Sequence, residues 1–177
     1  MRSNGFICLG IILMSFAGTT PCRSQADMFV TDKPSPLKLI SKELAPTMQF
    51  EGSVQLSGRF LVLRRQHAKR APVLQVLFYP DDSSAGLLPR LSTDRPIKEL
   101  LISNSDKATA MLFDSGTIKK ILTKELLSAT VGAMVTIRDY RLVVECDQRW
   151  YLAELVSASL MQKVAAGGPE NVRVGCG

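Results

Sequence analysis

The sequence predicts a mainly β domain of the α+β type, in which five strands form a small barrel and one helix lies between the third and fourth strands. Two observations support this prediction. In several segments, β-branched and aromatic residues alternate with polar ones, as they do along strands that bury one face. Only residues 117–130 show the spacing of apolar side chains that is typical of an amphipathic helix. The chain has 177 residues, of which 46% are hydrophobic, so it can bury a core as one domain.

The N-terminal segment has the features of a secretory signal peptide. Arg2 precedes an apolar run over residues 6–17, and small residues occupy the −3 and −1 positions of a cleavage site after Ala26. About a dozen apolar residues are too few for a membrane span, which needs roughly 20. We therefore expect residues 1–26 to be removed and the protein to be periplasmic or secreted, with no stable membrane span. The alternatives are an uncleaved signal anchor and a lipid anchor at Cys22.

The next segment, residues 27–47, contains three prolines and scattered charges. This composition indicates an extended leader with little packing of its own. The barrel domain and a C-terminal tail then occupy residues 48–177.

Two strands are predicted at the start of this domain. Over residues 54–62, apolar side chains alternate with polar ones, which favours a first strand with one buried face. Basic residues dominate 64–71, which we expect to form a loop. The run 73–79 predicts the second strand, because apolar and aromatic residues fill it and Pro80 follows it.

The middle of the chain is predicted to be less regular. Glycine, proline and turn-forming residues interrupt 83–107, apart from a short apolar run at 100–102. We predict the third strand over 108–113 and the helix over 117–130. Apolar residues at helical spacing form one face of this helix, and they are Ile118, Ile121, Leu122 and Leu126. Gly132 can end the helix.

The last two strands are predicted between Gly132 and Leu160, with a bend between them at residues 146–149. Most of this stretch is rich in β-branched and aromatic residues. Its alternation of apolar and polar residues slips by one position near Arg138 and Asp139. Such a slip turns later side chains to the other face, so we predict a bulge or sharp bend there.

The predicted order is strand, strand, strand, helix, strand, strand. This is the order of the OB-fold, a five-stranded and partly open barrel. The alternative is an α+β roll, in which the helix packs on an antiparallel sheet.

Three features extend this interpretation to a resemblance. The first is the step Asp-Arg-Pro-Ile at residues 94–97, the second is the helix that leads directly into a Gly-x-x-Val-x-Ile strand from Gly132, and the third is a final closing strand. Over residues 55–160 the chain resembles small exported bacterial proteins of unknown function that carry an OB-like barrel after a signal peptide. The histidine-rich step that some of them have between the last two strands is replaced here by residues 145–148. The resemblance implies a fold but no ligand.

Removal of the signal peptide would leave two cysteines, Cys146 and Cys176. An even number of cysteines in an exported protein favours a disulfide, which would hold the C-terminal tail at the bend of the last two strands. Two free thiols or an intermolecular bridge are the alternatives. Two cysteines and one histidine without paired spacing do not make a metal-ligand set, so we expect no metal and no cofactor.

The basic segment between the first two strands is the best candidate for a binding site. In OB-folds this loop borders the ligand groove, and its cations suit phosphates or acidic sugars. The candidate ligand-binding residues are Arg64, Arg65, His67, Lys69, Arg70 and Tyr79. The simpler alternative is a solvated loop without a ligand. Trp150 is interpreted as a core or rim aromatic, with stacking on a sugar as the alternative.

The sequence contains no recognisable catalytic motif. It has no Gly-x-Ser-x-Gly segment and no glycine-rich phosphate loop, and signal cleavage would leave no Cys/His nucleophile pair. We therefore expect a non-enzymatic binding or accessory module of the bacterial envelope, whose partner is a protein or an anionic saccharide. The expected export and an aromatic content of only 6% argue against nucleic acid. The alternative is a small periplasmic hydrolase that uses His67 with Asp81 or Asp82.

Overall fold

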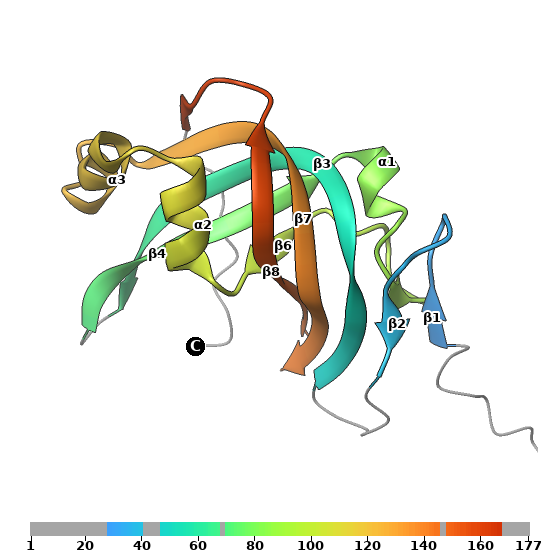
Figure 1. Ribbon diagram of the computed structural model, residues 1–177. Coiled ribbons are helices and arrows are strands. Elements are labelled where there is room, and N and C mark those ends of the chain that lie inside the picture. The colour runs from blue at the N-terminus through green and yellow to red at the C-terminus, as the bar shows by residue number, and fades with distance from the viewer. Residues whose placement is uncertain (1–27, 41–46, 68–69, 146–147, 168–177) are drawn as a thin grey trace, which may run out of the picture.

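The computed structural model describes residues 28–40, 47–67, 70–145 and 148–167. Within these residues the protein is mainly β, and five strands form a ring-like sheet around the main apolar core (Figure 1). In this part of the chain, no helix is long and apolar enough to cross a membrane.

The ring closes because its first and fourth strands in the chain pair with each other. In their order around the ring, the strands are β3 (Thr47–His67), β4 (Arg70–Pro80), β6 (Leu100–Ile102), β8 (Gln148–Leu160) and β7 (Ser128–Glu145). β7 pairs in turn with β3, which completes the ring. Neighbouring strands run antiparallel, except that β6 and β8 run parallel.

The remaining elements are short. They are the strands β1 (Phe29–Val30), β2 (Lys38–Leu39), β5 (Arg90–Leu91) and β9 (Ala165–Gly167), and the helices α1 (Asp82–Ala85), α2 (Ser105–Leu112) and α3 (Ser115–Leu122). α2 and α3 connect β6 to β7, and α2 lies against β4 and β8 (Figure 1). Each of these two helices buries an apolar side chain in the core, Leu112 from α2 and Ile121 from α3.

The core follows the alternation of side chains along the strands. Phe60 and Val62 of β3 point into the ring and lie opposite Phe78 and Val76 of β4, and all four side chains are fully buried. The rings of Phe60 and Phe78 meet with their centroids 4.7 Å apart. Because successive residues of a strand face opposite sides, their neighbours point outward.

The leader packs more closely than the sequence predicts. β1 pairs with β5, and β2 pairs with β3. Leu37 is buried in the core, and the ring of Phe29 meets that of Phe50 edge to face at 5.2 Å. An ion pair of 2.8 Å also joins Asp32 to Arg90. The described part of the leader therefore belongs to the fold.

The prediction of the third strand over 108–113 is wrong. These residues lie mostly in α2, where Ala108, Thr109 and Leu112 are buried at helical spacing. The third strand is β6, whose three residues pair with β4 on one side and with β8 on the other. A strand this short carries almost no periodic signal, so its neighbours determine its conformation.

The predicted helix over 117–130 starts close to the observed one but ends too late. Asp114 precedes α3 and accepts a hydrogen bond of 2.8 Å from the Thr117 N–H group, as a helix cap does. α3 ends at Leu122, and Lys124 then adopts a left-handed conformation with φ of 66°. A left-handed residue after the last turn ends a helix, and it is usually glycine. β7 begins soon afterwards, so residues 128–130 are strand.

The long strands β7 and β8 confirm the two strands predicted between Gly132 and Leu160, and they also confirm the bulge predicted near Arg138 and Asp139. The register between β7 and β8 shifts between Arg138 and Arg141, and Asp139 has φ of 48°. Gln49 of β3 donates a hydrogen bond of 2.7 Å to the Asp139 carboxylate, which fixes the bulge from the neighbouring strand.

One side chain continues the ring beyond the end of β6. Asn104 directly precedes α2, but its amide does not cap this helix. Instead, its Nδ2 donates to the Leu155 carbonyl and its Oδ1 accepts from the Leu155 N–H group, each at 2.9 Å. Asn104 thus makes the two hydrogen bonds that a neighbouring strand would otherwise offer to β8.

Candidate functional site

A pocket of about 830 Å³ opens on the outer side of the ring. Tyr79 of β4 and Leu101 of β6 contribute to its wall, and both face outward because their neighbours Phe78 and Leu100 are buried in the core. The rest of the wall comes from residues 93–99, between β5 and β6, and from residues 148–151 at the start of β8. Segments far apart in the sequence therefore meet at this pocket.

The segment 93–99 is held in place by an apolar anchor. Ile97 is only 4% exposed and belongs to the main core. Its neighbours Arg95 and Lys98 are exposed and line the pocket. Burial of one apolar residue in a polar segment thus fixes two cations at the rim.

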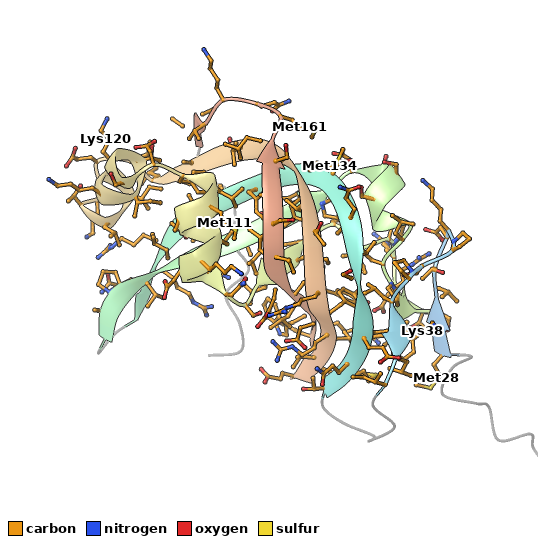
Figure 2. The ribbon with its side chains drawn as sticks, viewed as in Figure 1. Met28, Lys38, Met111, Lys120, Met134 and Met161 are labelled. Atoms are coloured by element: carbon orange, nitrogen blue, oxygen red, sulfur yellow. The ribbon has the colours of Figure 1, made fainter. Side chains whose placement is uncertain are left out.

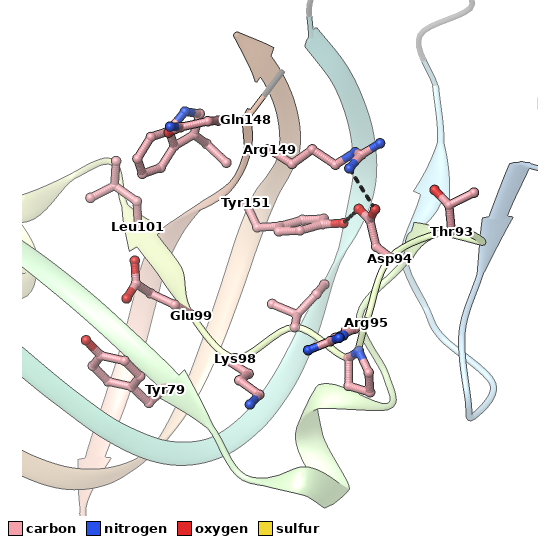
Figure 3. A pocket seen from close by; sticks show the side chains of 13 residues that line it. Tyr79, Thr93, Asp94, Arg95, Lys98, Glu99, Leu101, Gln148, Arg149 and Tyr151 are labelled. Atoms are coloured by element: carbon pink, nitrogen blue, oxygen red, sulfur yellow. Dashed lines mark hydrogen bonds and ion pairs between the residues drawn. The ribbon is translucent and has the colours of Figure 1, made fainter. Parts of the chain in front are cut away.

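Asp94 forms the polar centre of the pocket (Figure 3). Its Oδ2 accepts a hydrogen bond of 2.6 Å from the Tyr151 hydroxyl, and its Oδ1 forms an ion pair of 3.2 Å with Nη1 of Arg149. The Asp94 side chain is only 11% exposed, whereas that of Arg149 is 43% exposed. Both carboxylate oxygens are therefore engaged, and the guanidinium remains partly open to solvent.

The ring of Tyr151 is fixed from the core side. It stacks on Tyr140 with the two centroids 6.2 Å apart and the planes at 15°. Burial is the larger cause and the hydrogen bond to Asp94 the smaller cause that raise the pKa of Tyr151 above its ordinary value. The Tyr151 hydroxyl thus stays protonated at neutral pH and can act as the donor to Asp94.

The remaining wall combines aromatic and polar surface. Tyr79 and Trp150 are partly buried, and the guanidinium carbon of Arg59 lies 5.0 Å from the centroid of the Tyr79 ring. Glu99 and Gln148 add further polar groups. Such a mixture of aromatic surface and polar groups is typical of pockets that bind small ligands, and the volume lies within their usual range of roughly 300–1,000 Å³.

The structure separates the predicted basic site from this pocket. Of the predicted ligand-binding residues, Tyr79 lines the pocket, but Arg64 and Arg65 pair with Leu74 and Val73 farther along the β3–β4 hairpin. The expected loop over 64–71 is mostly strand, with β3 ending at His67 and β4 beginning at Arg70. Lys69 lies outside the described residues, as do the side chains of His67 and Arg70.

The structure does not bring His67 close to the two aspartates that follow β4. The backbone of His67 pairs with Arg70 at one end of β4, whereas Asp81 follows Pro80 at the other end. Ten residues of strand correspond to roughly 30 Å along the chain. The Asp81 carboxylate instead accepts a hydrogen bond of 2.7 Å from the Ser57 hydroxyl.

Other predicted features lie outside the described residues. This is true of the signal peptide over residues 1–26, and of Cys146 and Cys176. Within the part that the structure describes, no group of three or more His, Cys, Asp and Glu side chains could hold a metal ion.

Sequence reasoning missed the centre of the site. In the sequence, Asp94 stands out only as part of a turn and of the step at 94–97, Arg149 only as part of the predicted bend at 146–149, and Tyr151 only as part of a strand. No spacing rule links residues 94 and 149. The parallel pairing of β6 with β8 brings the two segments together.

Comparisons with known proteins identified no relative of the chain. No protein family, no curated protein and no solved structure was found to match the chain.

Proposed function

We propose that the protein is an exported, non-enzymatic binding module of the bacterial envelope, and that the pocket around Asp94 holds a saccharide. One observation carries this proposal. A pocket of about 830 Å³ combines partly buried aromatic rings with cations, and both oxygens of its central carboxylate, Asp94, are engaged by Tyr151 and Arg149. A sugar can place its apolar ring face on an aromatic side chain and direct its hydroxyls to polar groups.

The order of the strands supports an OB-like barrel as part of this proposal. Numbered along the chain, the strands of the ring follow each other as one, two, three, five and four, and the helices α2 and α3 connect the third to the fourth. OB-folds bind oligosaccharides and oligonucleotides on the face of their second and third strands. The corresponding strands here are β4 and β6, which supply Tyr79 and Leu101 to the pocket.

A saccharide fits the pocket better than the other partners do. The proposed export would separate the protein from cellular nucleic acid, which argues against a nucleic acid as the ligand. The concave shape suits a compact ligand more than a flat protein surface. An envelope protein is the alternative partner.

The binding experiment compares two sites that carry the same kind of charge. We expect an acidic oligosaccharide to bind the wild-type protein in isothermal titration calorimetry. The double variant R95E/K98E should weaken this binding about tenfold or more, which corresponds to about 1.4 kcal/mol or more. The matched control is K119E/K120E, which makes the same charge change at exposed positions on α3 (Figure 2 shows Lys120).

A third variant tests the predicted basic site directly. R65E changes an exposed charge on the β3–β4 hairpin, and we expect it to bind as the wild type does. If R65E alone loses binding, the ligand site belongs to the hairpin and the pocket proposal is wrong. Capture of a periplasmic protein without any saccharide binding would instead support the alternative partner.

Export and disulfide formation are the other parts of the proposal. Export with signal cleavage after Ala26 would place the protein in an oxidising compartment, which favours a bond between Cys146 and Cys176. We expect intact-mass measurement of the exported protein, alkylated without a reductant, to give the mass of residues 27–177 with no alkyl group added. Alkylation at two positions would mean free thiols and would contradict the bond. After reduction, the same protein should take up two alkyl groups.

A further inference from the structure

We infer that the pocket selects saccharides that carry a carboxylate. In the absence of ligand, Arg149 forms an ion pair with Asp94, and the carboxylate of the ligand competes with Asp94 for Arg149. The inference rests on the proposed function, because it names the ligand class and the residue that recognises it. It follows from the unequal way in which Asp94 is held by its two partners.

One contact of Asp94 is short and shielded. The Tyr151 hydroxyl donates to Oδ2 at 2.6 Å, and the Tyr151 ring is fixed by its stacking on Tyr140. Because the Asp94 side chain is 11% exposed, water competes little for this contact. Tyr151 thus positions the carboxylate whether or not Arg149 stays in place.

The other contact is long and open. Nη1 of Arg149 lies 3.2 Å from Oδ1 of Asp94, and the Arg149 side chain is 43% exposed. No second ion pair of Arg149 is present among the described residues. The guanidinium end of this pair is open to water, and the Asp94 carboxylate keeps its hydrogen bond from Tyr151, so the release of Arg149 costs less than the loss of a fully buried ion pair.

A ligand carboxylate would offer Arg149 a better partner. The guanidinium group is a planar fork that binds carboxylates through two parallel hydrogen bonds, and such paired bonds are stronger than a single one. Arg95 and Lys98, both exposed at the same pocket, would attract the approaching anion. A neutral sugar gains none of these contacts.

The test uses the only tryptophan of the chain as its reporter. Trp150 lines the pocket, so ligand binding should change its fluorescence. The probes are a trimer of galacturonic acid and the methyl ester of the same trimer, in which each carboxylate loses its charge and gains a methyl group. We expect the wild type to bind the acid at least about tenfold more tightly than the ester.

Two substitutions separate the roles of Asp94 and Arg149. D94N keeps an oxygen that can accept from Tyr151 but removes the charge, so it should tighten binding of the acid about three- to tenfold and leave the ester unchanged. R149Q should weaken binding of the acid about tenfold and change ester binding by less than about twofold. R149K retains the positive charge without the planar guanidinium group, so its affinity for the acid should lie between those of the wild type and R149Q.

The decisive measurement is the double variant D94N/R149Q. If Asp94 acts by competing for Arg149, D94N should have no effect once Arg149 is absent, as a double-mutant cycle shows. Equal effects of D94N in both backgrounds would overturn the inference. The inference would also be overturned if the wild type bound the ester more tightly than the acid, or if it bound the free C-terminus of a peptide but not the acid trimer.

The outcome also distinguishes this inference from the proposed function. If the wild type binds the ester as well as the acid, the pocket is a saccharide site but the selection by Arg149 is wrong. If it binds neither sugar, both the proposed saccharide function and this inference fail. K119Q on α3 is the matched control for R149Q, because it removes an exposed cation that does not line the pocket.

Discussion

Replacing Tyr140 with alanine is expected to lower the free energy of unfolding by about 3–5 kcal/mol, because it removes a large aromatic side chain from the core. Tyr140 is fully buried. Its ring lies 5.3 Å from that of Phe50 and 6.2 Å from that of Tyr151, measured between centroids. Urea denaturation followed by circular dichroism measures the change, and a loss below about 1 kcal/mol would contradict the described core.

The conservative variant Tyr140→Phe separates the ring from its hydroxyl. The hydroxyl donates a hydrogen bond of 2.6 Å to the Pro89 carbonyl, and burial raises the pKa of Tyr140 well above its ordinary value. The group is therefore a permanent donor at neutral pH. We expect Tyr140→Phe to cost about 1–2 kcal/mol, because the ring remains packed while this hydrogen bond is lost.

Gly58→Ala is expected to destabilise the protein by about 3 kcal/mol, at the upper end of the usual cost of overpacking, because the added methyl group has no space. Gly58 pairs with Pro80 of β4 on one side and with Ala133 of β7 on the other. A Cβ atom there would overlap the Tyr79 carbonyl oxygen and would lie 2.7 Å from Cζ of Phe78. The carbonyl belongs to the β3–β4 ladder, so it cannot move without disturbing the pairing of these strands.

The control for Gly58→Ala is Ser53→Ala, which changes an exposed residue on the same strand. Surface substitutions of this kind change the free energy of unfolding by no more than about 0.5 kcal/mol. Both variants are compared with the wild type in thermal unfolding. Equal melting temperatures for Gly58→Ala and Ser53→Ala would contradict the close approach of β3 and β4 at this position.

The parts of the fold that could be predicted from the sequence are those with a long periodic pattern. Alternation over the two strands between Gly132 and Leu160 was sufficient to predict both strands, and its slip was sufficient to predict the bulge at Asp139. The third strand could not be predicted in the same way. Leu100–Ile102 is too short for a pattern, and its pairing depends on strands that are distant in the sequence.

The candidate site was harder to predict for a related reason. Clustered charges over 64–71 are conspicuous in the sequence, whereas the structure brings together single residues from separate segments. Asp94 follows Ser92 and Thr93 and resembles any polar turn. Its role as the centre of the pocket depends on its contacts with Arg149 and Tyr151, which lie close to it only because the ring closes.

Asn104 has a consequence for how the protein behaves among other copies of itself. A strand with unpaired backbone groups is a template on which another chain can add a strand, and such edges promote aggregation. β6 covers only Leu152 and Ala153 of β8, so the next backbone groups would be open at that edge. The Asn104 amide binds both groups of Leu155 and blocks strand addition there. The Asn104 side chain thereby adds to the cover that α2 gives to β8, where the third strand of the ring is too short to pair with it further.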